Sequence, residues 1–252
     1  MPKAVIFDCY NTLLHYESRE GKDGIWELML ATIEFMIDDD LPIAPEELKA
    51  LYQKAYDKEE RECQSKRGSY AEVTLARVWR DVLIQLNIPE QTAEEKAKDI
   101  LMLYRLYTRK HQSLFPNVQE ELMALKKHGM KLLLLSNAQT CFIYDELPEE
   151  ILEIFDEVLI SEEVGVKKPS EEFFRLAFEK LGTEPENIVF VGDSVEEDII
   201  PAGKFGCPCI MIGKQKNEED ILSNVIAFDP YQESGYDGLS EIIVALNISD
   251  EI

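Results

Sequence analysis

The sequence predicts an α/β fold in which a doubly wound parallel sheet is interrupted by an all-helical insertion. Two observations predict it. After residue 113, short apolar runs alternate with amphipathic helix patterns, which is typical of parallel strands joined by helices. Between residues 17 and 112 the patterns are helical, and no segment has the character of a strand. We therefore expect a discontinuous α/β domain of residues 1–16 and 113–252, with a helical domain of residues 17–112 inserted after the first strand.

The expected strands are short, continuous apolar runs, as in strands that are covered on both faces of a sheet. They comprise residues 4–7, 131–135, 157–160, 188–191 and 209–212. Helices begin after Asn117 and Ser170, two residue types that favour helix N-caps, and a last helix covers residues 239–246.

Four helices are expected in the insertion. The first covers residues 25–37, and Pro45 opens the second at a position in the first turn where proline is tolerated. The third and fourth are expected to begin at capping-box patterns, Ser69 with Glu72 and Thr92 with Glu95. The large aromatic residues expected to pack between these helices are Trp26, Phe35, Trp79 and Tyr104.

The composition limits the partners and the cellular location. The 252 residues carry a formal net charge of −24, so nucleic acid is not an expected partner, because phosphate backbones bind Lys and Arg. The same charge repels anionic substrates at long range, so an anionic substrate requires a local cation. No apolar run approaches the roughly 18 residues that span a bilayer, and the five scattered cysteines do not resemble a disulfide framework. We expect a cytoplasmic protein that acts on a small molecule.

Polar residues follow the ends of three expected strands, where the ligands of an open parallel sheet bind. These residues are Asp8, Ser136 with Asn137, and Asp193, and Lys168 lies in a fourth loop. Asp8 can act as a nucleophile, as carboxylates do in enzymes that form an aspartyl phosphate. Asp8 and Asp193 together make a carboxylate pair suited to Mg²⁺.

Other side chains complete the expected site. Ser136 and Asn137 can donate hydrogen bonds to a substrate oxygen, and Lys168 can neutralise charge that develops in the transition state. Asp198 either holds Lys168 in an ion pair or hydrogen-bonds to the ligands of the metal. Ser194 is included beside Asp198, although a serine there can also simply cap a helix.

Four segments, taken together, resemble the motifs of the haloacid-dehalogenase superfamily. In chain order they are Asp8-Cys9-Tyr10-Asn11-Thr12, then Ser136, then Lys168-Pro169, then Gly192-Asp193-Ser194 with Asp198. Their order and their α/β context match over essentially the whole chain. The helical insertion between the first and second motifs resembles the cap domain of this family.

The resemblance implies a Rossmann-like core and a role for each motif. Asp8 would be the nucleophile that forms a covalent intermediate. The ligands of Mg²⁺ would be Asp8, the backbone carbonyl of Tyr10, and Asp193. Thr12 and Ser136 would bind the transferred group, and Lys168 would bridge that group to Asp8. Tyr10 and Asn137 are expected to contact the substrate, and the cap would close over the site, exclude water and select the substrate.

Tyr10 departs from the family's phosphatases, which have a second Asp at this position that protonates the leaving oxygen and then activates water. A phenol with a pKa of about 10 is a poor substitute, and general acid–base catalysis typically contributes about 10²–10⁴ in rate. We therefore hypothesise a Mg²⁺-dependent phosphohydrolase that acts through an aspartyl phosphate on Asp8. Its substrate would be a small phosphorylated metabolite with a good leaving group, such as an acyl phosphate or pyrophosphate.

Two alternatives stay open. The family's 2-haloacid dehalogenases have Tyr at the position of Tyr10, and a halide leaves without needing a proton. Those enzymes are metal-free, however, and they have Ser and Asn where this chain has Asp193 and Val195, and Tyr where it has Phe174. The other alternative is a catalytically weak binding or regulatory protein, which would not require the retained carboxylates and lysine.

Overall fold

The computed structural model describes residues 2–19, 24–213, 225–232 and 234–246. The chain forms two compact units, one of Met1–Tyr16 with Gln112–Ile252 and one of Glu17–His111. Among the described residues, no helix is both long enough and apolar enough to cross a membrane.

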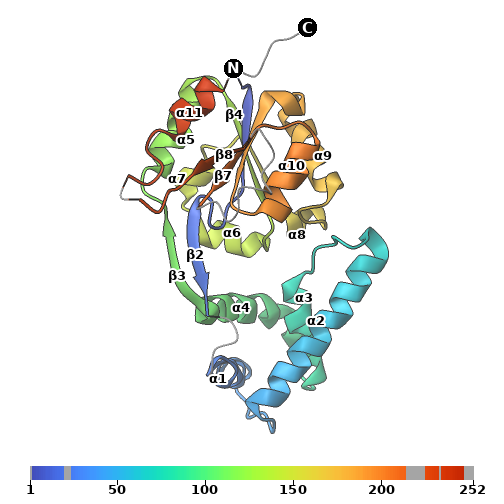
Figure 1. Cartoon of the computed structure of the whole chain (residues 1–252). Coiled ribbons are helices and arrows are strands. Elements are labelled where there is room, and N and C mark those ends of the chain that lie inside the picture. Colours follow the sequence, from blue (N-terminus) through green and yellow to red (C-terminus); the bar gives the residue numbers. More distant parts are fainter. Residues whose placement is uncertain (1, 20–23, 214–224, 233, 247–252) are drawn as a thin grey trace. The chain divides into compact units, whose positions relative to one another are not determined.

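The first unit contains a six-stranded parallel sheet (Figure 1). In spatial order its strands are β5 (Glu157–Ile160), β4 (Lys131–Ser136), β1 (Ala4–Phe7), β6 (Ile188–Gly192), β7 (Cys209–Ile212) and β8 (Val225–Phe228). The α/β fold with a parallel sheet is therefore confirmed. The edge strand β8 was not predicted.

Residues alternate between the two faces of the sheet, as the period of two in a strand requires. Val5 and Phe7 of β1 belong to one apolar cluster, while Ala4 and Ile6 belong to another. All four side chains are buried, which explains why the strand has a continuous apolar sequence rather than an alternating one.

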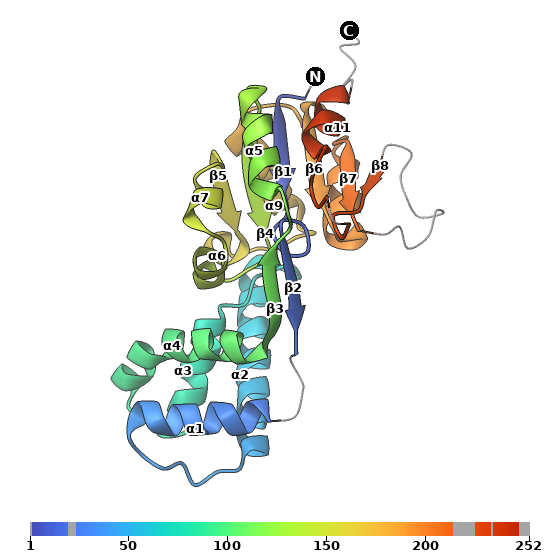
Figure 2. The ribbon, with the colours of Figure 1, turned by 90° about the vertical axis from the view of Figure 1, so that its left-hand side faces the viewer.

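Helices cover both faces, so the sheet is doubly wound (Figure 2). The first cluster receives side chains from α5 (Val118–Lys127) and α11 (Leu239–Ala245), and the second from α9 (Glu171–Leu181) and α10 (Ile200–Lys204). The shorter elements of this unit are α6 (Thr140–Glu146), α7 (Glu149–Leu152), α8 (Ser161–Val164), the 3₁₀ helix η1 (Pro185–Asn187) and the π-helical turn η2 (Val195–Ile199).

The second unit is built from four helices: α1 (Ile25–Ile37), α2 (Pro45–Arg67), α3 (Leu75–Gln85) and α4 (Glu90–Thr108). Aromatic rings from all four meet in its core, where the centroids of Tyr52 and Trp79 lie 4.9 Å apart and those of Trp26 and Tyr104 lie 5.8 Å apart. Trp26, Trp79 and Tyr104 thus pack between helices as expected.

Phe35 does not pack between helices, and that prediction is wrong, because its side chain is 86% exposed. The buried face of α1 carries Ile25, Met29 and Ile33. Phe35 follows Ile33 by two residues, and two residues turn a helix by about 200°, which directs Phe35 away from this face.

Both expected capping boxes are also wrong. Helix α3 begins at Leu75 after Thr74, and α4 begins at Glu90 after Pro89. A two-stranded sheet of β2 (Leu14–Ser18) and β3 (Arg109–Leu114) was missed as well. Most residues of β3 are polar, so it lacks the apolar run by which the other strands were recognised.

Candidate active site

Asp8 lies directly after the buried strand β1, and only 6% of its surface is exposed. Both of its carboxylate oxygens accept hydrogen bonds. The Thr12 hydroxyl donates to Oδ2 at 2.8 Å, and the Lys168 ammonium donates to Oδ1 at 2.6 Å. The carboxylate is therefore fixed in orientation, although its two donors are 156 residues apart in sequence.

The loop after Asp8 is tight enough to bring Thr12 back beneath the carboxylate. The carbonyl of Cys9 accepts hydrogen bonds from the backbone N–H groups of Thr12, Leu13 and Leu14. Asn11 has φ of 57°, a left-handed conformation that Asn tolerates better than most residues. The short polar sequence after β1 thus has a structural function in addition to any chemical one.

Lys168 is 2% exposed and lies between two carboxylates, Asp8 and Asp198. Its ammonium nitrogen is 2.6 Å from Asp8 Oδ1 and 2.7 Å from Asp198 Oδ1. Burial alone would lower the pKa of Lys168, but the charges of Asp198 and Asp8 outweigh it and raise the pKa above its ordinary value. The lysine therefore remains a cation at neutral pH.

Asn137 holds the backbone of Lys168. Its Oδ1 accepts from the Lys168 N–H at 2.7 Å, and its Nδ2 donates to the Lys168 carbonyl at 3.1 Å. Nδ2 also donates to Glu197 Oε2 at 3.2 Å. Asn137 thus fixes the loop that carries the lysine, and its expected contact with the substrate stays a prediction.

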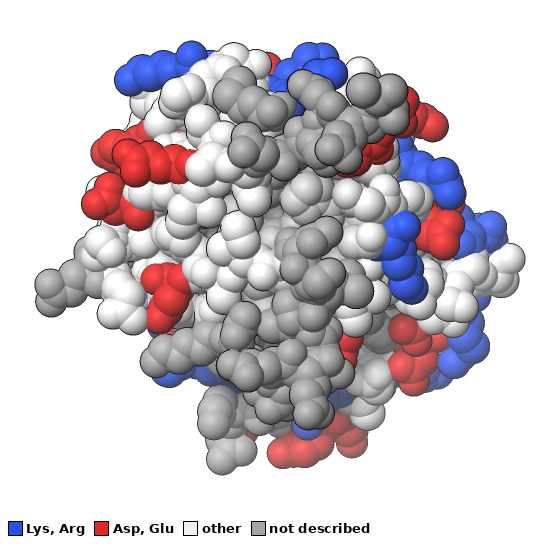
Figure 3. Space-filling view, turned by 45° about the horizontal axis from the view of Figure 1, so that its top comes forward, with Lys and Arg blue, Asp and Glu red and all other residues white. Residues whose placement is uncertain are grey.

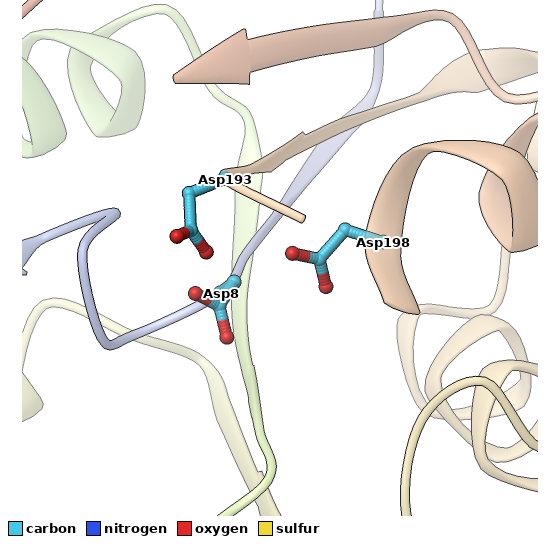
Figure 4. Close-up of side chains that lie close together, drawn as sticks. All are labelled: Asp8, Asp193 and Asp198. Carbon is cyan, nitrogen blue, oxygen red and sulfur yellow. The ribbon is translucent and has the colours of Figure 1, made fainter. Parts of the chain in front are cut away.

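Three carboxylates converge at the ends of β1 and β6 (Figure 4). One oxygen each from Asp8, Asp193 and Asp198 lies within 4.8 Å of the others. Burial, followed by the charges of Asp8 and Asp198, raises the pKa of Asp193 to about 7. Three acids at this spacing repel one another, and Lys168 compensates for only part of their charge.

The turn after β6 places Asp198 close to the sheet. A Cβ atom at Gly192 would lie only 2.6 Å from Asp198 Oδ2, so this position requires glycine. The Ser194 N–H donates to Asp198 Oδ2 at 3.1 Å. The Ser194 hydroxyl accepts from the Glu197 N–H at 3.1 Å and therefore caps the π-helical turn η2, the simpler of its two expected roles.

The donor set of this cluster fits Mg²⁺. Carboxylate oxygens are the ligands that this hard cation prefers, and a divalent ion among Asp8, Asp193 and Asp198 would relieve their mutual repulsion. Among the described residues, Lys168 donates to Asp8 and Asp198 and Thr12 donates to Asp8, but neither donates to Asp193. It is therefore the acid with most capacity to bind a metal.

Ser136 ends strand β4 and is completely buried. Its hydroxyl has no hydrogen-bond partner among the residues that the structure describes. A buried hydroxyl without a partner is costly, so this atom is suited to bind a ligand oxygen.

Two contacts at the loop after β1 were not foreseen. The Tyr10 hydroxyl donates to Glu146 Oε2 at 2.7 Å, and the Tyr236 hydroxyl donates to the carbonyl of Thr12. Glu146 and Tyr236 are both buried and lie 136 and 224 residues from their partners. No local sequence signal marks either residue, because each acts only through a distant part of the chain.

The chain also matches a known protein family. Residues 2–206 match the model of the haloacid dehalogenase-like hydrolases, which covers more than half of the chain. The chain belongs to this hydrolase family. Lys168 and the three acids all lie within the matched residues, whereas Tyr236 lies beyond them.

Two phosphatases are similar in sequence to this chain. Glyceraldehyde 3-phosphate phosphatase of Methanothermobacter thermautotrophicus is 30% identical over 227 residues, which are 87% of this chain and 89% of that protein. Phosphoglycolate phosphatase of Salmonella typhi is 30% identical over 165 residues, which are 62% of each chain.

Two solved structures have the same fold as this chain. A 2-haloacid dehalogenase from Pseudomonas syringae pv. Tomato has a TM-score of 0.68 at 20% identity, covering 97% of this chain and 99% of that one. A phosphatase of the same superfamily from Thermococcus onnurineus has a TM-score of 0.57 at 21% identity, covering 96% and 97%. Dehalogenases and phosphatases thus share the architecture, so the chemistry must be inferred from the site.

Proposed function

We propose that the chain is a Mg²⁺-dependent phosphohydrolase that acts through an aspartyl phosphate on Asp8. The observation that carries the proposal is the arrangement of Asp8, whose Oδ1 faces the Lys168 ammonium at 2.6 Å and whose carboxylate lies within 4.8 Å of Asp193 and Asp198. Asp8 and Asp198 form ion pairs with Lys168, but without a metal Asp193 would add only repulsion, whereas a phosphoryl substrate requires added positive charge.

In the proposed reaction, a carboxylate oxygen of Asp8 attacks phosphorus and the bond from phosphorus to the leaving oxygen breaks. The leaving group departs with the electron pair. Water then attacks phosphorus, the bond from phosphorus to the Asp8 oxygen breaks, and the protons of the water leave with inorganic phosphate, which restores Asp8 as a carboxylate. Lys168 stabilises negative charge on the transferring group and orients Asp8, and Ser136 would bind a phosphoryl oxygen. Thr12 orients Asp8 through its hydroxyl, and the predicted contact of Thr12 with the transferred group would require that hydroxyl to turn away from Asp8. Mg²⁺, when bound, would neutralise further phosphoryl charge.

We propose a substrate with a good leaving group, such as an acyl phosphate or pyrophosphate. The Tyr10 hydroxyl donates to Glu146, so its proton is already engaged, and a phenol is in any case a weak acid. A leaving group that departs as a stable anion does not need that proton. The relatives named for glyceraldehyde 3-phosphate and phosphoglycolate support a small phosphorylated metabolite as the substrate class.

We assign the catalytic core to residues 1–16 and 113–252 and the cap to residues 17–112. The site residues all belong to the first of these, and the family resemblance supports a substrate-selecting role for the helical unit. A cytoplasmic location and the lack of a nucleic-acid partner, as expected from the sequence, are part of the same proposal.

The test is phosphate release from acetyl phosphate and pyrophosphate, compared with glyceraldehyde 3-phosphate and phosphoglycolate. We expect Mg²⁺-dependent turnover of the first pair, inhibited by EDTA and reduced at least about 10³-fold by Asp8→Asn, which removes the nucleophile. Asp145→Asn is the matched control, because Asp145 is exposed on α6. Equal turnover of both pairs would contradict the role given to Tyr10, and an unaffected Asp8→Asn variant would refute the mechanism.

Metal-independent dehalogenation is the competing activity, and Tyr10 is the residue that favours it. The crowding of Asp193 and Asp198 near Asp8 opposes it, because without a metal ion these acids disfavour a further anion, such as the carboxylate of a haloacid, at the site. Halide release from 2-chloropropionate in the presence of EDTA would decide for the dehalogenase. A protein that neither releases halide nor phosphate, and does not bind beryllofluoride with Mg²⁺, would be a binding or regulatory member of the family.

A further inference from the structure

Tyr236, which follows strand β8 in the chain, contacts the loop after Asp8, the candidate nucleophile. The Tyr236 hydroxyl donates a hydrogen bond to the backbone carbonyl of Thr12, and the Thr12 hydroxyl donates to Asp8 Oδ2 at 2.8 Å. Two consecutive hydrogen bonds therefore connect Tyr236 to the carboxylate. Tyr236 and Thr12 are both almost completely buried, at 1% and 0% exposure.

The backbone around Tyr236 is held by hydrogen bonds with the two residues that precede α5, Pro116 and Asn117. The Tyr236 N–H donates to the carbonyl of Pro116 at 2.9 Å. Gly235 has φ of 56°, and a Cβ atom there would lie 2.3 Å from the same carbonyl oxygen, so the approach requires glycine. Asn117 Nδ2 also donates to the carbonyl of Ser234 at 3.0 Å.

The ring of Tyr236 is fixed as well. It packs against Phe115 with a centroid separation of 6.0 Å and against Phe228 of β8 at 5.6 Å. Burial, together with the charges of Asp8 and Asp193, raises the pKa of Tyr236 well above its ordinary value. The hydroxyl is thus a donor on a rigid, buried ring.

We infer that Tyr236 is a positioning residue for the nucleophile, acting through Thr12; this inference rests on the proposed function of Asp8. The rigid ring fixes the Thr12 carbonyl, which fixes the Thr12 backbone and so directs its hydroxyl to Asp8 Oδ2. With Lys168 on Oδ1, the carboxylate is held from both sides, and a nucleophile held in the attacking geometry reacts faster than a mobile one. Tyr236 itself does not touch the reacting atoms.

A double-mutant cycle of Tyr236→Phe and Thr12→Val tests the inference. Tyr236→Phe keeps the ring and removes only the donor, and Thr12→Val removes the hydroxyl that contacts Asp8. If Tyr236 acts through Thr12, Tyr236→Phe lowers kcat for acetyl phosphate about tenfold with little change in KM, but less than about twofold in the Thr12→Val background. An equal loss in both backgrounds, as a merely structural role would give, or no loss in either, would overturn the inference.

Tyr231→Phe is the matched control. Tyr231 lies in the same segment, is 51% exposed, and packs against Phe115 with a centroid separation of 5.0 Å. Because Tyr231 is half exposed and the substitution keeps its ring, kcat should stay within about twofold of the wild type. Thermal unfolding of each variant separates loss of fold from loss of positioning.

An NMR measurement that does not depend on turnover distinguishes failure of the proposed function from failure of the positioning role of Tyr236. The ¹³C resonance of the Asp8 carboxyl should differ between the wild type and Tyr236→Phe. It should be the same in Thr12→Val and in the double variant. If the wild type releases no phosphate, the proposed function fails while this shift still decides the inference. If Tyr236→Phe does not fold, 3-fluorotyrosine at position 236 retains the ring and strengthens the donor, and an unchanged Asp8 resonance then refutes the connection.

Discussion

Tyr10 is the residue that most restricts the chemistry of the site. Its hydroxyl donates to the buried carboxylate of Glu146, and its ring packs edge-on against Tyr16 with a centroid separation of 5.5 Å. It stands where the family's phosphatases have an acid, two residues after Asp8. The preference between good and poor leaving groups should therefore depend on this side chain.

Replacing Tyr10 with Asp should supply the missing acid. We expect Tyr10→Asp to raise turnover of phosphoglycolate relative to acetyl phosphate by about 10²-fold, because only the poorer leaving group needs a proton. Tyr10→Phe is the control, since it removes the hydroxyl without adding an acid. If Tyr10→Phe raised the ratio as much as Tyr10→Asp, added space rather than proton transfer would explain the effect.

Asp193 is the residue on which metal binding should depend most. Mg²⁺ should raise the melting temperature of the wild type by several degrees, because binding at 100 times Kd stabilises the folded state by about 2.7 kcal/mol. Asp193→Asn should reduce this shift and should raise the melting temperature measured in EDTA, because it removes one of three crowded charges. Asp145→Asn should change neither value. An undiminished Mg²⁺ shift in Asp193→Asn would place the metal elsewhere.

At the scale of the elements, Asp156 connects one helix to two strands. It directly precedes β5, its two oxygens each lie 2.6 Å from the ammonium of Lys126 on α5, and its Oδ2 accepts from the Leu132 N–H of β4 at 2.8 Å. Burial alone would raise the pKa of Asp156, but the hydrogen bonds from Lys126 and Leu132 outweigh it and lower the pKa below its ordinary value.

The lowered pKa of Asp156 predicts a stability contribution that depends on pH. A carboxyl group with a depressed folded-state pKa stabilises the fold above its unfolded value, and this contribution is lost as the pH falls through the folded value. Asp156→Asn should therefore lower the free energy of unfolding by about 1 kcal/mol or less at pH 7, because the pair is partly exposed to solvent. Urea unfolding should show the difference shrinking as the pH falls below about 4. A difference that stays constant down to pH 3 would contradict the assigned cause.

Elements also differ in how clearly the sequence marks them. Strands β1, β4, β5, β6 and β7 were predicted within one residue at each end, because burial on both faces requires continuous apolar runs. The partly exposed strands β2 and β3 lack such runs and were missed. Helix starts at Leu75 and Glu90 were misplaced, because neither capping-box pattern is used as a cap.

At the scale of the whole molecule, the main feature is the net charge of −24. On the face in Figure 3, acidic and basic side chains of the described residues both occur, and the acidic ones do not form a single patch there. The negative net charge creates a long-range field that repels an approaching phosphate ester. Lys168, which is buried, offsets this field only at the site itself.

Salt should therefore accelerate substrate capture. Raising NaCl from 10 to 150 mM shortens the Debye length from about 30 to about 8 Å, which screens the repulsion. We expect kcat/KM for acetyl phosphate, at saturating Mg²⁺, to increase by about two- to tenfold, while kcat stays constant because it begins from the bound complex. A fall in kcat/KM with salt would mean that a local positive field dominates the approach.

The sequence by itself determined the α/β fold, most strands of the sheet, and the residues that meet at its carboxyl edge. Asp8, Ser136, Lys168, Asp193 and Asp198 could be named because each follows or neighbours a recognisable apolar strand or motif, and a parallel sheet brings such strand ends together. The ion pairs of Lys168 with Asp8 and Asp198 are the contacts that this topology makes possible. The catalytic roles of these residues stay predictions.

The tertiary structure decided which groups hold that site in place. Glu146 accepts from Tyr10, Tyr236 donates to Thr12, and Asn137 holds the backbone of Lys168. A sequence pattern reports on neighbours within a few residues, because helices and strands repeat over that distance. Contacts across 136 and 224 residues depend instead on how loops close around the packed sheet, and only the folded chain specifies them.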